Sequence, residues 1–358
     1  MANAGELTAP VELPSVGQPS LPKSGFHAPL RFPRVSPAGV PRMLIIGRLA
    51  EIGFIVLPIA GLIFVGYLAG WTKHLGERAA DGLSEYVFGI AVPVLIFKTL
   101  SEAKMPEGGQ PWGYWIAYFV GAFIVFGIGF LVARRVFGRA HVEAVMQGFA
   151  SGQSNTVFVG VPVILNAFGS DGAVPLFLLI AVHLPVMTTA ATLFAEGSES
   201  GISRATLKRL LKALARNPIL FGIYAGAIGQ IVGVQATGPA GEVVRMLAAS
   251  SVPCALISMG LALRRYGFAG DIHASLVISV LKLVVHPLIV LALVQVLPMP
   301  PVWAGVAVVF AAMPCGVNAY LLASHYKAGV ASTASAVSLS TLLSLFTVTI
   351  WLYVLGVG

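Results

Sequence analysis

The segment SGQSNTVFVGVP (residues 151–162) lies inside a stretch that is long and apolar enough to cross a lipid bilayer. Its first half is small or polar, and a polar run at membrane depth is costly unless protein shields it or it lines a cavity. Roughly ten residues precede the run and about a dozen follow it, so at 1.5 Å per residue each flank covers about half of a ~30 Å hydrocarbon core. We therefore expect two half-helices joined by an unwound crossover.

A second apolar stretch, residues 301–326, contains the same kind of interruption. The sequence Met-Pro-Cys-Gly-Val-Asn (residues 313–318) includes proline and glycine, which interrupt a helix. In the first break, Ser154, Asn155 and Thr156 are residue types that cap helix N-termini. Two half-helix N-termini would then meet near mid-membrane and offer N–H donors and a partial positive charge to an anion. The alternative is a pair of kinked helices whose polar groups hold neighbouring spans together.

The composition indicates an integral membrane protein. Of 358 residues, 57% are hydrophobic and only 10% are charged, whereas soluble domains have about 25% charged residues. A bilayer core requires about 20 apolar residues per helix. The expected fold is all-α with ten transmembrane helices at residues 50–70, 83–101, 112–133, 141–168, 172–194, 217–235, 241–263, 273–298, 301–326 and 330–356.

The distribution of lysine and arginine predicts the orientation. The loops after the odd-numbered spans hold most of these residues, whereas Lys104 and Arg245 lie on the opposite side. The positive-inside rule then places the odd-numbered loops in the cytoplasm and both termini outside. Residues 1–44 are proline-rich and are expected to be a disordered tail. The cations in this tail conflict with the orientation, and a translational start at Met43 would remove most of them.

The two halves of the chain are similar at an offset near 160 residues. Pro93 corresponds to Pro253, and Phe149 corresponds to Phe310. Five spans in each half is an odd number, so residues 45–194 and 217–358 would form two inverted five-helix repeats, with the broken fourth and ninth helices crossing. The alternative is chance similarity between apolar sequences. Between the repeats, the segment 195–216 contains SRATLKRLLKALAR, which is typical of a short amphipathic helix on the cytoplasmic surface.

The positions of charged residues favour an anionic cargo. No expected span has a carboxylate near its centre, which a cation exchanger would need. Lys98 could neutralise a carboxylate, or its side chain could extend to the interface. Lys282 and His286 share a helix face and are candidates for coupling or charge compensation, together with His183, which titrates near neutral pH in principle. The alternative for these three is a structural hydrogen-bonding role.

Other classes of function lack support in the sequence. No HExxH, GxSxG or phosphate-binding glycine motif is present, so we expect neither an enzyme nor a bound metal or cofactor. Cys254 and Cys315 lie in apolar spans and predict no disulfide. The net charge of +8 belongs to membrane-flanking loops, and no nucleic-acid partner is expected. The expected partners are a small organic anion and the lipid bilayer, with a homodimer left open.

Several motifs resemble the auxin efflux carrier family. They are IVLPIAGLIFVGYLAG, FGIAVPVLIFKTL, SNTVFVGVPV and AMPCGVNAYLLASHY, in this order within residues 45–358. The resemblance implies ten spans in two inverted repeats, a scaffold domain, a transport domain that moves like an elevator, and location in a bacterial inner membrane. It also implies a carboxylate at the crossover of spans four and nine.

The resemblance extends to individual positions. Asn155 matches the crossover asparagine of the fourth span and Pro314 the crossover proline of the ninth, with Asn318 less directly matched. Plant members have an Asn-Pro-Asn-Thr-Tyr-like crossover, whereas this chain has Gln153-Ser-Asn-Thr156-Val without the proline, so auxin is not carried over as the cargo. The expected substrate-binding set is Gln153, Ser154, Asn155, Thr156, Pro314, Asn318 and Lys98.

The favoured function is a secondary transporter of malonate or a related dicarboxylate. Three alternatives remain open: an auxin-like monocarboxylate efflux carrier, a membrane sensor that binds an organic acid without moving it, and a sodium-coupled carrier of the bile-acid type. The absence of mid-span carboxylates speaks against the last of these.

Overall fold

Helices form almost all of the described part of the chain. The computed structural model describes residues 42–103, 112–196, 208, 215–234, 236–267 and 270–357. The tail up to residue 41 and most of the 195–216 loop lie outside these ranges, so the tail and amphipathic-loop predictions stay untested. Helices are expected for an apolar chain in lipid, because each backbone N–H and C=O must find a partner within the protein.

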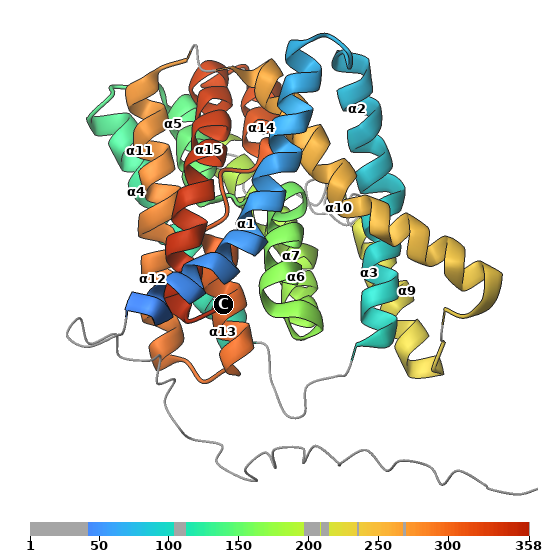
Figure 1. The fold of residues 1–358 in the computed structure, drawn as a ribbon. Coiled ribbons are helices and arrows are strands. Elements are labelled where there is room, and N and C mark those ends of the chain that lie inside the picture. The colour runs from blue at the N-terminus through green and yellow to red at the C-terminus, as the bar shows by residue number, and fades with distance from the viewer. Residues whose placement is uncertain are drawn as a thin grey trace, which may run out of the picture. The chain divides into compact units, whose positions relative to one another are not determined.

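The elements follow one another in a simple order (Figure 1). They are α1 (Arg42–Trp71), α2 (Glu77–Tyr86), η1 (Val87–Ala91), α3 (Val92–Glu102), α4 (Trp112–Arg135), α5 (His141–Gly152), η2 (Thr156–Gly160), α6 (Val161–Phe168), η3 (Gly169–Gly172), α7 (Ala173–Glu196), α9 (Pro218–Val232), α10 (Gly238–Tyr266), α11 (Ile272–Val280), η4 (Leu281–Val285), α12 (His286–Val296), α13 (Pro301–Ala311), α14 (Val317–Tyr326) and α15 (Val330–Leu355).

Seven helical segments in the described ranges are long and apolar enough to cross a membrane by length and composition. One of them, Thr156–Glu196, has 41 residues, which is far more than the ~20 that one crossing needs. Pro218–Val232 and Pro301–Ala311 are shorter apolar helices. The protein is therefore an all-helical, multi-pass membrane protein.

Proline explains three turns of π-helix that interrupt the α-helices. The π-helical segments η1, η2 and η4 each end two residues before a proline, namely Pro93, Pro162 and Pro287. Proline has no N–H and its ring clashes with the carbonyl four residues earlier, so the helix widens in the turn before it. The sequence showed the prolines, but we did not predict the π-helical turns.

Small residues allow two pairs of helices to approach closely. Helix α1 packs along α10, and α3 packs along α9. A Cβ atom placed on Gly222 of α9 would lie 2.6 Å from the carbonyl oxygen of Pro93 on α3, so no larger residue fits there. Close packing of α9 on α3 therefore depends on glycine at this position.

The remaining helices pack mainly with one another. Helix α4 contacts α5 and α12, and α11 contacts α15. In Figure 1 these helices lie on one side, whereas α2, α3, α9 and α10 lie on the other, with α6 and α7 between them.

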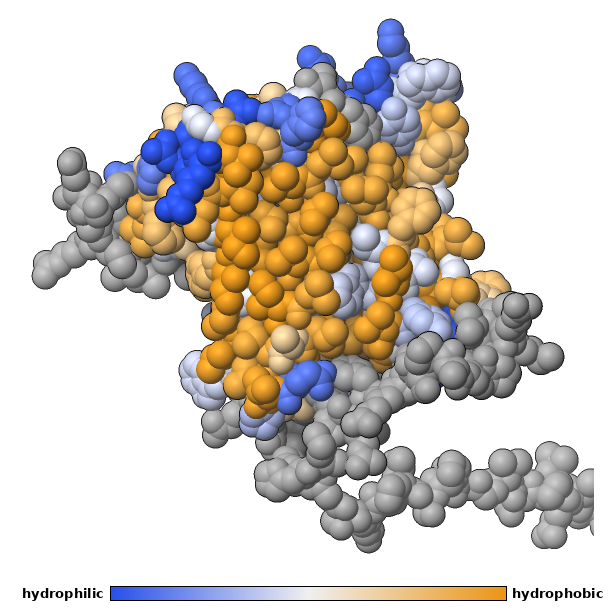
Figure 2. All heavy atoms as spheres, turned by 90° about the vertical axis from the view of Figure 1, so that its left-hand side faces the viewer, coloured by the Kyte–Doolittle hydropathy of each residue, from blue (hydrophilic) through white to orange (hydrophobic). Residues whose placement is uncertain are grey.

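The outer surface of the helices is strongly apolar. Large hydrophobic side chains such as Phe54, Phe221 and Ile231 are more than 70% exposed. Figure 2 shows a broad hydrophobic surface with hydrophilic residues gathered at its upper end. Exposed apolar surface of this extent requires lipid in place of water.

Candidate functional site

The two interrupted helices bond to each other at their breaks. An isolated antiparallel bridge joins Ser154 and Cys315. The N–H of Asn155 donates to the carbonyl of Pro314 (2.8 Å), and the N–H of Gly316 donates to the carbonyl of Gln153 (3.1 Å). These bonds satisfy backbone groups that the helix breaks release inside the protein. We call this pair of segments, residues 153–155 and 314–316, the crossover bridge.

A new helical segment begins directly after each half of the crossover bridge. Asn155 is the N-cap of η2 and Gly316 is the N-cap of α14, and neither forms a side-chain capping bond. The prediction that polar side chains cap the second half-helix is therefore wrong. The side chain of Asn155 donates to the Sδ of Met259 (3.4 Å), and Ser154 Oγ donates to the carbonyl of Phe310 (3.0 Å). Side chains therefore leave the N-terminal N–H groups free for another acceptor.

A cavity lies at these two N-termini. Its volume is about 70 Å³, which is small beside the ~300–1,000 Å³ of typical ligand pockets and suits a molecule of few heavy atoms. The polar lining consists of Asn155, Thr156, Asn217 and Asn318, and the rest is mostly apolar, including Phe88 and Phe158. None of the lining residues is charged, so an anion would meet only backbone N–H groups, amides and the positive ends of helices.

The predicted binding residues divide into three groups. Asn155, Thr156 and Asn318 line the cavity. Gln153, Ser154 and Pro314 belong to the crossover bridge. Lys98 does not line the cavity and instead forms an ion pair with Glu102 at 2.8 Å.

Gln153 illustrates how tight the crossover bridge is. Its Oε1 is buried and has no hydrogen-bond partner among the described residues. A Cβ on Gly316 would collide with this amide group. A larger residue at 316 would therefore force the Gln153 amide to move.

A buried basic cluster lies against the crossover bridge. His183, Lys282 and His286 are all 0% exposed. Lys282 Nζ donates to the carbonyl of Ala311, the last residue of α13, and lies 3.2 Å from His286 Nδ1. The sequence predicted that Lys282 and His286 share a helix face, and this contact confirms it. The Lys282 amino group therefore lies at the C-terminus of α13, where the helix dipole carries a partial negative charge.

His183 and Tyr118 connect the buried basic cluster to Ser154 in the first helix break. The N–H of Ser154 donates to His183 Nε2 (3.2 Å), so the ring proton must be on Nδ1. That proton then faces the hydroxyl of Tyr118 at 3.2 Å, and Tyr118 also lies 3.0 Å from Ser154 Oγ. The result is a chain of hydrogen bonds from His183 through Tyr118 and Ser154 to the carbonyl of Phe310.

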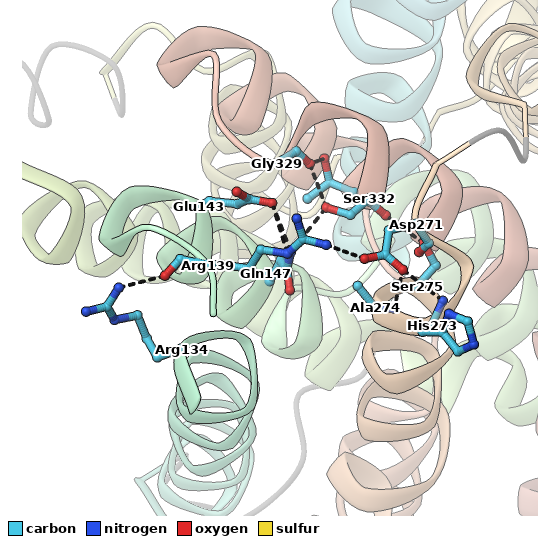
Figure 3. A network of polar contacts seen from close by, with 11 residues as sticks. Arg134, Arg139, Glu143, Gln147, Asp271, His273, Ala274, Ser275, Gly329 and Ser332 are labelled. Atoms are coloured by element: carbon cyan, nitrogen blue, oxygen red, sulfur yellow. Dashed lines mark hydrogen bonds and ion pairs between the residues drawn. The ribbon is translucent and has the colours of Figure 1, made fainter. Parts of the chain in front are cut away.

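A second polar network holds the other end of α5 (Figure 3). Arg139 pairs with Asp271 and with Glu143 of α5 (3.5 Å). Gln147 of α5 contacts Glu143 and Ser332, each at 3.4 Å. The network therefore fastens α5 to the N-termini of α11 and α15, so these three helices are held together at this end.

Asp271 is the N-cap residue in this network. Its Oδ1 accepts from the N–H groups of His273 and Ala274. The bond from Ala274 and the guanidinium of Arg139 hold the pKa of Asp271 below its ordinary value.

Three residues of the region, Tyr118, Met259 and Asn217, were not predicted from the sequence. Tyr118 and Met259 lie within apolar spans, where aromatic and methionine side chains usually pack, so nothing marked them. Asn217 did carry a signal, because asparagine before proline is typical of a helix start. Its Oδ1 caps α9 through the N–H of Ile219 (2.9 Å).

Comparison with known proteins identifies the family of the chain. The family described as "Membrane transport protein" matches residues 54–203 and 196–352. The chain belongs to this family, the auxin efflux carriers. It is therefore a membrane transport protein by family, as its motifs predicted.

The relatives are named as transporters. A protein of Rhizobium meliloti (strain 1021) named "Putative malonate transporter" is 30% identical over 87% of this chain and 98% of its own length. An "Uncharacterized transporter" of Methanothermobacter thermautotrophicus is 28% identical over 84% of this chain and 97% of its own. "Uncharacterized transporter YfdV" of Escherichia coli (strain K12) is 21% identical, with 84% and 96% covered.

Proposed function

We propose that this protein is a secondary active transporter that moves a small organic anion, malonate or a related dicarboxylate, by alternating access. The observation that carries the proposal is the cavity at the crossover bridge, onto which two helix N-termini and three amide side chains open. The name of the Rhizobium relative supports malonate as the first candidate.

The proposed architecture is ten spans in two inverted repeats. In it, α5 and α6 form the broken fourth span, and α13 and α14 form the broken ninth. The 41-residue segment Thr156–Glu196 then contains the end of one span and all of the next. Two helix contacts support a two-fold relation between the repeats. Helix α1 of the first span packs with α10 of the seventh, and α3 of the second span packs with α9 of the sixth. Exchanging the two repeats turns one of these contacts into the other.

The proposed orientation places the odd-numbered loops in the cytoplasm of a bacterial inner membrane, with both termini outside. The basic residues near the ends of α4 and α10 support this orientation. Alternating access would move the helices around the crossover bridge past α1, α3, α9 and α10.

The proposed roles follow from the position of each residue. Backbone N–H groups of η2 and α14, with Asn155, Thr156 and Asn318, would bind a carboxylate. Gln153, Ser154 and Pro314 would hold the crossover bridge in shape. We assign charge compensation to Lys282 and not to Lys98, because Lys98 already pairs with Glu102.

One observation favours a second candidate, an auxin-like monocarboxylate. Most of the cavity lining is apolar, with Phe88, Phe158 and Leu184 among the lining residues, and an apolar lining suits an apolar tail better than a second carboxylate. A sensor that binds an acid without moving it remains the alternative of another class.

The test is uptake of labelled malonate into proteoliposomes, comparing the native protein with Asn155→Ala. Unlabelled malate and indole-3-acetate serve as competitors. We expect the native protein to take up malonate saturably and Asn155→Ala to lose this uptake. Stronger inhibition by malate would favour a dicarboxylate cargo, and stronger inhibition by indole-3-acetate would favour a monocarboxylate. Unchanged uptake in Asn155→Ala would rule out the cavity as the site, and binding of an acid without uptake or counterflow would favour the sensor.

A further inference from the structure

We infer that the protein moves a proton together with its anion, and that Lys282 is the group that carries this second cargo. The inference rests on the proposed transport function and extends it. It starts from the position of a fully buried lysine beside the crossover bridge.

Lys282 has no acidic partner in the described part of the chain. Its Nζ contacts the carbonyl of Ala311 and the Nδ1 of His286, and the ion pairs there all involve other cations. Burying an unpaired charge in a membrane protein is costly, so such a lysine needs a counter-charge or must be neutral for part of the cycle.

Among the described residues, the surroundings of Lys282 supply further basic groups and no carboxylate. The titratable side chains buried around it are His286 on α12, His183 on α7, Tyr118 on α4 and Cys315 in the second break. The buried residues of α5, α11 and α15, which pack in the same region, include no titratable side chain. Within the described ranges, a positive charge on Lys282 therefore has no fixed negative partner.

The missing negative charge can come from the cargo. The cavity lies at the same crossover bridge, and its lining contains no charged side chain. An anion there and a proton on Lys282 would compensate each other through the bridge. When the anion leaves, the lysine loses its counter-charge and releases the proton, so neither charge is left alone in the interior.

His286 offers a path for that proton. Its Nδ1 faces Lys282, so the ring proton lies on Nε2 when the ammonium donates to Nδ1. That Nε2 is buried and forms no hydrogen bond of full geometry with the described residues, and the ring interacts with the backbone of Tyr118. A donor held this weakly beside the lysine is suited to passing a proton.

The experiment uses the full-length protein in proteoliposomes with a pH dye inside and the membrane potential clamped. Malonate added outside should acidify the lumen in a saturable way. With one proton per anion, a lumen one pH unit more alkaline than the outside should accumulate malonate about tenfold. Lys282→Arg keeps the charge but cannot release a proton, so it should lose both the accumulation of malonate and the acidification of the lumen.

The matched control is Lys73→Arg, the same change at an exposed loop position, which should keep both activities. Accumulation and acidification by Lys282→Arg equal to native would overturn the inference. Should this variant not fold, the native protein decides alone: malonate uptake without lumen acidification overturns the inference while the proposed function stands. Absence of counterflow with any organic acid in the native protein would instead remove the proposed function, and the inference with it.

Discussion

The N–H of Asn155 donates a 2.8 Å hydrogen bond to the carbonyl of Pro314, which joins the two helix breaks through their backbones. The bond does not involve the asparagine side chain, which donates to the Sδ of Met259 and keeps its amide oxygen for another partner. The side chain lines the cavity beside Thr156 and Asn318. The same position thus serves the fold through its backbone and can serve binding through its amide.

Asn318→Ala should weaken transport without preventing folding. Its side chain lines the cavity at the start of α14, and a hydrogen bond to a charged group contributes about 1.5–3 kcal/mol. We expect the KM for malonate to rise roughly 10- to 100-fold, measured by uptake into proteoliposomes. The control is Asn166→Ala, whose side chain donates to the carbonyl of Pro162 within α6. Equal effects of both changes would argue against a binding role for Asn318.

Gly222→Ala should destabilise the protein. A Cβ at this position would lie 2.6 Å from the carbonyl of Pro93, so α9 and α3 must separate, at a cost of about 1–3 kcal/mol. Thermal unfolding in detergent should therefore shift to lower temperature. Gly127→Ala in α4 is the control, because nothing lies within 4 Å of its Cβ position. An unshifted unfolding curve for Gly222→Ala would show that this contact is not tight.

Ionisation of Asp271 should make the melting temperature of the protein depend on pH in the acidic range. Folding lowers its pKa, so the ionised carboxylate stabilises the folded state above the ordinary value near 3.9, and this contribution is lost as pH falls through the folded-state pKa. Asn is a comparable N-cap, so Asp271→Asn removes the ion pair with Arg139 and keeps the cap. We expect its melting temperature to be lower by at most about 3 °C at pH 6, with the gap closing below about pH 4.

Asp271→Ala completes this comparison, because it removes the N-cap as well as the ion pair. Relative to Asp271→Asn, we expect the free energy of unfolding to fall by about a further 0.5–2 kcal/mol. A gap between native protein and Asp271→Asn that stays constant down to pH 3 would contradict the role of the ionised carboxylate.

The orientation can be tested by cysteine labelling in a Cys254→Ala background. Lys73 and Glu242 are exposed and lie in or near loops on opposite sides in the proposed topology. A membrane-impermeant maleimide should label Glu242→Cys in spheroplasts, and Lys73→Cys only after permeabilisation. Labelling of both cysteines in intact spheroplasts would refute the inverted arrangement of the two halves.

The class of protein and the places where its helices break can both be predicted from the order of residues alone. Apolar length identifies segments that lipid can accept, because every backbone group must bond within its own helix. The polar run at 151–156 and the Pro-Cys-Gly run at 314–316 interrupt those segments, and the structure has breaks at both. The boundaries of α7, of α15 and of the continuous segment Ile272–Val296, which comprises α11, η4 and α12, also agree with the predicted spans to within a few residues.

Which side chains share a site depends on the packing of distant segments and could not be predicted in advance. Lys98 and Lys282 look equivalent in sequence, as single lysines in apolar spans, but one pairs with Glu102 and the other lies at the end of α13. Likewise, Ser154 resembles a helix cap, yet its hydroxyl bonds to Phe310. Periodicity shows which face of a helix is apolar, whereas the partner of a polar atom depends on how distant segments pack, and that information is not contained in local sequence.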